Sequence, residues 1–73
     1  MNLEQLGELA AKRGNECFGI WVKMGKLFYR RREVEHLCTS TGFTPDQQAS
    51  NRNELKQLDR QINELRIRLN AML

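Results

Sequence analysis

The stretch Thr39-Ser40-Thr41-Gly42-Phe43-Thr44-Pro45-Asp46-Gln47 holds the turn chemistry that decides the fold. Gly42 can adopt the left-handed conformation that ends a helix. Directly after it, Thr44, Pro45 and Gln47 make a helix start, because they combine a Thr-x-x-Gln capping box with a proline at the first helical position. A helix stop followed at once by a helix start predicts an all-α fold, an antiparallel helical hairpin with a very short loop.

The segment after the turn is expected to be helical over about 45–72. Its apolar residues alternate spacings of three and four, which is the pattern of a coiled-coil seam. The seam consists of Leu55, Leu58, Ile62, Leu65, Leu69 and Met72. Ile67 departs from this pattern, because at about 100° per residue it lies roughly opposite the seam. One face of this helix is therefore expected to pack against a partner helix.

The segment before the turn predicts a second helix, over about 3–41, that packs on the first. Its main apolar stripe consists of Ile20, Met24, Leu27, Val34 and Cys38, flanked by Cys17, Trp21 and Phe28. Folding the chain about Phe43 places Trp21 beside Leu65. Gly14–Asn15 is a candidate break, because glycine costs about 1 kcal/mol relative to alanine inside a helix and asparagine can cap a new start.

The first 13 residues extend beyond the reach of the partner helix. Leu3, Leu6, Leu9 and Ala10 have nothing to cover them within a two-helix hairpin. Residues 1–13 are therefore expected either to fold back as a separate short helix or to dock on another chain as a dimer arm. Both alternatives stay open at the level of the sequence.

The size of the chain limits its organisation to a single domain, residues 1–73. A core of this size supplies about 3–5 kcal/mol of net stability, so we expect dimerisation into a helical bundle. The mean hydropathy is −0.66, and no apolar run approaches the roughly 20 residues that span a bilayer. The first residues lack the basic start and apolar stretch of a secretory signal. We therefore expect a cytoplasmic protein with no membrane contact.

No combination of residues in the chain predicts catalysis, a cofactor, a metal site or a small-molecule substrate. Cys17 and Cys38 are 21 residues apart, roughly 31 Å along one helix, so they are expected to be reduced core residues. An intermolecular disulfide or a reactive thiol is the alternative. His36 is the single histidine, and the four ligands of a structural zinc site are not available in close pairs. The chain is accordingly expected not to be an enzyme.

The basic residues concentrate in the helix before the turn. Residues 12–32 hold seven Lys and Arg against one Glu, in a chain whose net charge is +3. Lys23, Lys26 and Arg30 fall on one flank, Arg31 and Arg32 turn toward other sides, and Arg31 can pair with Glu35. Such a strip can meet the phosphates of a nucleic acid or an acidic protein surface, or it can remain a solvated face.

A second apolar stripe runs along the same helix and consists of Phe18, Val22 and Tyr29, with Gly25 between them. It lies more than about 100° from the main stripe, where a lone hairpin would leave it in water. The folded-back residues 1–13, a second copy or another protein are the three candidates to cover it. Exposed aromatic residues with a basic rim are typical of interfaces. The predicted partner-binding residues are Phe18, Trp21, Val22, Lys23, Lys26, Tyr29 and Arg30.

These observations favour a small non-enzymatic helical binding module. It would work as a homodimer or on a heterologous protein partner, in the manner of phage- or plasmid-encoded inhibitors and regulators of host proteins. The alternative is a dimeric nucleic-acid-binding regulator that uses Lys23, Lys26, Arg30, Arg31 and Arg32. A third hypothesis is a structural role in assembly, in which the helix over 45–72 pairs with a helix of a larger protein complex.

Overall fold

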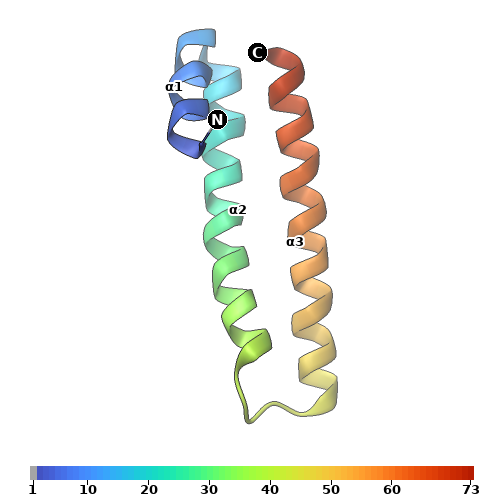
Figure 1. The fold of residues 1–73 in the computed structure, drawn as a ribbon. Helices are drawn as coiled ribbons and strands as arrows, with labels where there is room; N and C mark the ends of the chain where they lie inside the picture. The colour runs from blue at the N-terminus through green and yellow to red at the C-terminus, as the bar shows by residue number, and fades with distance from the viewer. Residues whose placement is uncertain (1) are drawn as a thin grey trace.

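The computed structural model describes residues 2–73, and within that range the chain forms three α-helices and no strand. The helices are α1 (Leu3–Arg13), α2 (Asn15–Thr39) and α3 (Pro45–Met72). The all-α prediction is therefore confirmed. Figure 1 shows α2 and α3 side by side and running in opposite directions, with α1 folded back along the first part of α2. The molecule is a rod of 46 × 18 × 17 Å. Met1, the start of the predicted 1–13 arm, lies outside the described residues.

The loop between α2 and α3 carries the predicted turn signals. Gly42 has a φ of +93°, in the left-handed region that favours glycine. The Thr44 hydroxyl accepts from the Gln47 backbone N–H at 3.2 Å, and the Gln47 side chain accepts from the Thr44 N–H at 2.9 Å. The capping box and the helix start at Pro45 are therefore confirmed.

The helix predicted over about 3–41 differs from the structure at two places. It ends at Thr39, because Ser40 is extended and its hydroxyl donates to the His36 carbonyl at 2.8 Å, in competition with further helical bonds. It is also divided at Gly14, inside the candidate break. Gly14 has a φ of +133° and a ψ of 178°, a conformation open essentially to glycine alone. This one residue reverses the chain between α1 and α2.

The core runs along the interface between α2 and α3 and continues beneath α1. One buried cluster consists of Ala10, Cys17, Ile20, Met24 and Leu69. The predicted seam of α3 is confirmed, since its members are buried or half-buried: Leu55, Leu58, Ile62, Leu65, Leu69 and Met72. Ile67 is 62% exposed, as its position opposite the seam predicts. Both α1 and α3 therefore pack on α2, which is the central helix of the three.

Trp21 explains why α1 lies where it does. The sequence places this side chain beside Leu65 of α3, but the structure turns it toward α1. Its indole N–H donates to the Leu3 carbonyl at 2.9 Å. A Cβ atom built on Gly7 would lie 2.5 Å from the indole ring, so only glycine allows the α1 backbone to come this close. Trp21 thus anchors α1 against α2.

Candidate partner-binding surface

The second apolar stripe of α2 remains largely open after α1 has folded back. Phe18 is 41% exposed, Tyr29 is 72% exposed and Val22 is half-buried. Phe18 lies at the edge of α1, and its ring centroid is 5.5 Å from that of Trp21. A Cβ atom built on Gly25 would meet nothing within 4 Å, so the space between Val22 and Tyr29 is also open. We call Phe18, Val22, Gly25 and Tyr29 the aromatic stripe.

Trp21 differs from the other predicted partner-binding residues in its surroundings. It is half-buried, and its one hydrogen-bond donor is already used by Leu3. A buried indole N–H normally has such a partner, and here the partner comes from the same chain. Trp21 therefore holds α1 in place, and its half-buried ring also lines a surface hollow next to Phe18.

Three of the predicted basic residues are available for contact with another molecule. Lys23, Lys26 and Arg32 are exposed, and none has a carboxylate at ion-pair distance anywhere in residues 2–73. On the helical wheel, Lys26 and Arg32 each fall about 60° from Tyr29, on opposite sides of it. They therefore form a cationic rim to the aromatic stripe.

Arg30 is occupied by carboxylates of its own chain. It bonds the Glu54 carboxylate of α3 through two nitrogens at 2.9 and 3.0 Å, and Glu33 lies 3.5 Å away. The hydrogen bonds and the negative charge of Glu54 raise the pKa of the Arg30 guanidinium above its ordinary value. Arg30 therefore links α2 to α3 and contributes less free charge to the surface than the sequence suggests.

Arg31 forms a second link of the same kind. Its guanidinium donates to Asp59 of α3 and, at 2.9 Å, to Glu35 one turn further along α2. The predicted pair of Arg31 with Glu35 is thus confirmed. The hydrogen bond to Asp59 is the main cause that raises the pKa of Arg31. The contact with Asp59 was missed in the sequence analysis, because it depends on the register between two helices.

The remaining reactive side chains stand apart from one another. Cys17 is buried, Cys38 is half-buried and both are free thiols. His36 is exposed near Tyr29, Arg32 and Glu33. Among residues 2–73, no three His, Cys, Asp or Glu side chains come together as metal ligands would. Over the same range, no helix has the length and apolar composition needed to cross a bilayer.

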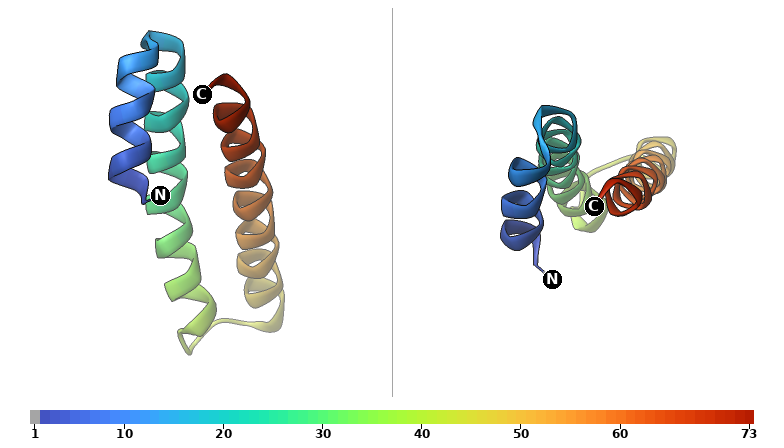
Figure 2. Two further views of the ribbon diagram at one scale, coloured as in Figure 1. Left: turned by 45° about the horizontal axis from the view of Figure 1, so that its top comes forward. Right: turned by 90° about the horizontal axis from the view of Figure 1, so that it is seen from above.

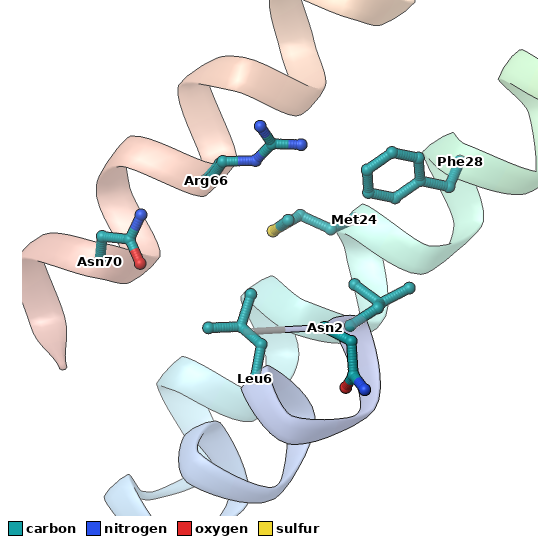
Figure 3. A pocket seen from close by; sticks show the side chains of 7 residues that line it. Asn2, Leu6, Met24, Phe28, Arg66 and Asn70 are labelled. Atoms are coloured by element: carbon teal, nitrogen blue, oxygen red, sulfur yellow. The ribbon is translucent and has the colours of Figure 1, made fainter.

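A groove between α1 and α3 forms a second open surface. The sequence predicted the residues of its α1 side but not those of its α3 side. It has a volume of about 540 Å³ and is lined by Asn2, Leu3, Leu6, Met24, Phe28, Arg66 and Asn70. In Figure 3 the Arg66 side chain extends from α3 toward Met24 and Phe28, and Leu6 faces the same space from α1. The uncovered leucines of residues 1–13 signalled this surface. Arg66 and Asn70 could be assigned to it only with the packing known.

Arg13 links the last turn of α1 to the end of α3. Its guanidinium donates to the carbonyls of Met72 at 3.1 Å and Leu73 at 2.9 Å, so the end of α1 is tied to the end of α3. Cations near a helix C-terminus are stabilising because the last carbonyls lack partners within the helix. These two hydrogen bonds connect α1 directly to α3, in addition to the packing of both helices on α2.

Comparison of the chain with protein families, with curated proteins and with solved structures finds no match.

Proposed function

We propose that this protein is a small helical binding module that acts by occupying a surface of another protein and performs no catalysis. In this proposal α2 and α3 form an antiparallel hairpin, α1 braces it, and two copies associate into a larger bundle. An inhibitor or regulator encoded by a phage or plasmid is the kind of protein we have in mind. The two free thiols, Cys17 and Cys38, suit a reducing compartment such as the cytoplasm.

One observation carries this proposal: Phe18 and Tyr29 stay exposed although α1 has folded back on the same helix. Aromatic side chains bury 150–250 Å² each and dominate the energetics of interfaces. A cationic rim of Lys26 and Arg32 flanks Tyr29, which favours a partner with acidic residues around an apolar centre. The surface therefore has the composition of a protein-contact site.

The test compares matched variants in affinity purification from the native host, followed by mass spectrometry. We expect Phe18→Ser and Tyr29→Ser to lose the partner that the unchanged protein retains. Ile67→Ser is the control, because it removes from α3 an apolar side chain whose exposure lies between those of Phe18 and Tyr29. Circular dichroism establishes that all three variants keep their helices. Equal retention of the partner by all of them would refute the proposal that the aromatic stripe binds it.

The alternative function, a dimeric nucleic-acid-binding regulator, rests on the cations that have no partner in the chain. Arg30 and Arg31 are already bound to carboxylates, which leaves Lys23, Lys26 and Arg32 for phosphates. Three phosphate contacts would weaken binding roughly 20-fold between about 50 and about 150 mM salt. Titration of mixed-sequence DNA and RNA at both salt concentrations tests this alternative. The absence of binding at the lower salt concentration would exclude it.

A further inference from the structure

The first half of the aromatic stripe has an acidic edge. Figure 2 shows α1 alongside only the first half of α2, on a different side of it from α3. In this half, Phe18 and Trp21 line a hollow whose other walls come from α1: Glu4, Gly7, Glu8 and Ala11. Glu4 and Glu8 are exposed, and neither has a cation at ion-pair distance among residues 2–73. An apolar centre with unpaired carboxylates beside it results.

The second half of the stripe lies beyond the end of α1 and is basic. It contains Tyr29, and Arg32 follows about one turn further along α2. On the helical wheel Arg32 falls within about 20° of Trp21, so it points to the flank of α2 on which α1 packs. Lys26 falls about 120° from Arg32, on the opposite flank. One flank of the stripe thus carries carboxylates beside its first half and a guanidinium beside its second half.

A face with these two halves complements a second copy of itself that runs in the opposite direction. A two-fold axis perpendicular to two antiparallel helices brings the first half of each against the second half of the other. The same rotation keeps the α1 flank of both copies on one side of the pair. A parallel pair would instead bring like charges together, which is unfavourable. Charge complementarity therefore selects an antiparallel second copy as the occupant.

We propose that the aromatic stripes of two copies pack against each other in an antiparallel dimer whose two-fold axis passes at Gly25. A Cβ atom built on Gly25 would meet nothing within 4 Å, so the backbone of a second α2 can approach closely at this point. The inference rests on the proposed function, because it names a second copy of the chain as the partner of the same surface.

The register of this dimer brings its opposite charges together. Phe18 and Arg32 are each seven residues from Gly25, so they lie opposite each other across the interface. The guanidinium of one copy then meets the aromatic ring of Phe18 in the other and reaches Glu8, which lines the same hollow. Tyr29, about one turn nearer the axis, covers the rest of this hollow. Each of these contacts forms twice, as an interface between identical surfaces requires.

The first experiment measures the mass of the full chain against concentration by light scattering and sedimentation equilibrium. We expect a dimer whose dissociation constant rises about tenfold or more in Gly25→Gln, because a side chain at the axis separates the two helices. Gly19→Gln is the matched control, since a Cβ atom there also meets nothing within 4 Å. Glutamine is a better helix former than glycine, so both variants are expected to keep the fold. A monomer at all concentrations overturns the proposal, and so does a dimer that both variants weaken equally or neither weakens.

The second experiment exchanges charges across the proposed interface. We expect Glu8→Arg and Arg32→Glu each to weaken the dimer about fivefold or more, and the variant with both changes to regain most of the original affinity. Lys26→Gln is the control, because it removes an exposed cation from the opposite flank, and it is expected not to weaken the dimer. Two losses that simply add in the double variant would refute the proposed register. A loss in Lys26→Gln as large as that in Arg32→Glu would do the same.

Capture of a host protein is measured separately, so the two proposals can fail independently. A chain that stays monomeric but loses its host partner in Phe18→Ser and Tyr29→Ser overturns the dimer and leaves the proposed function standing. A dimer that follows the charge exchange, with a host partner that both serine variants retain, supports the dimer and refutes the proposed role of the stripe in binding that partner.

Discussion

At the end of the rod where α1 turns into α2, three helices enclose an apolar cluster, whereas toward the loop end two helices bury Val34 and Leu58 and are also joined by exposed arginine–carboxylate pairs. Met24 and Leu69 are fully buried in the first region, and Arg13 adds hydrogen bonds to the last carbonyls of α3. In the second region Arg30 and Arg31 bridge to the carboxylates of α3 across the interface. Apolar burial therefore contributes to both ends, and exposed ion pairs between α2 and α3 add to it toward the loop end.

This difference predicts which end of the rod contributes more to the free energy of unfolding. Buried apolar surface contributes roughly 25 cal/mol per Å², and salt does not screen this contribution as it screens ion pairs. Exposed ion pairs contribute little, because water and salt screen them and long side chains lose freedom on pairing. We therefore expect the α1 end to contain most of the stability and the loop end to open first. Each of the following changes tests one side of this comparison.

The largest effect is expected from Leu69→Ala, which removes a fully buried side chain from the three-helix end. Such a truncation costs about 2–5 kcal/mol of unfolding free energy, because it loses burial and leaves a cavity. This equals a large part of the stability of a chain this small, so the urea midpoint should fall steeply. Leu55→Ala, at a half-buried position nearer the loop, is the control. An equal or larger loss in the control would contradict the comparison.

The next effect is expected from Gly7→Ala, which tests the packing of α1 alone. A Cβ at this position meets the Trp21 ring at 2.5 Å, so α1 must shift, at a cost of about 1–3 kcal/mol. Gly19→Ala is the matched control: its Cβ meets nothing within 4 Å, and alanine in a helix interior gains about 0.5–1 kcal/mol. Urea unfolding gives both values, and Trp21 fluorescence reports any movement of α1. Changes of the same sign in both variants would refute the close approach.

The position of α1 marks the limit of what the sequence could predict. The break at Gly14–Asn15 was a candidate because glycine and asparagine have local conformational preferences. The face of α2 on which α1 lands depends on the hydrogen bond from Trp21 to Leu3, between residues 18 apart. The groove and its Arg66 depend on the same packing. Local signals thus locate the break, and only tertiary contacts decide the direction of the chain after it.

At the loop end, in contrast, contacts between residues close in the sequence determine most of the structure. Gly42, Thr44 and Gln47 act through contacts between close neighbours, so the turn and the start of α3 were predictable from the sequence. The pair of Arg31 with Glu35 was predictable for the same reason, since the two residues are one helical turn apart. The pairs of Arg30 with Glu54 and of Arg31 with Asp59 were not predicted, because they depend on the register of α2 against α3.

A smaller loss, about 1 kcal/mol, is expected from Thr44→Ala at the first turn of α3. The substitution removes the hydroxyl that accepts from the Gln47 N–H and so leaves this donor without its cap. Thr44→Ser keeps the hydroxyl and is the control. Urea unfolding measures the loss, and hydrogen exchange is expected to speed up at the start of α3 before it does so at Leu69. Uniform acceleration along the whole helix would show that the loop end is not a separate weak region.

The smallest loss is expected from Glu54→Gln, which removes the charge that Arg30 contacts across the interface. Both side chains are substantially exposed, so the pair is screened, and its loss should be smaller than that of Thr44→Ala. The difference between variant and unchanged protein should shrink as salt is raised toward 1 M, where the Debye length falls to about 3 Å. Leu69→Ala should show no such dependence, because its loss comes from apolar burial. A Glu54→Gln effect that persists at high salt would mean that Glu54 stabilises the interface by something other than its charge.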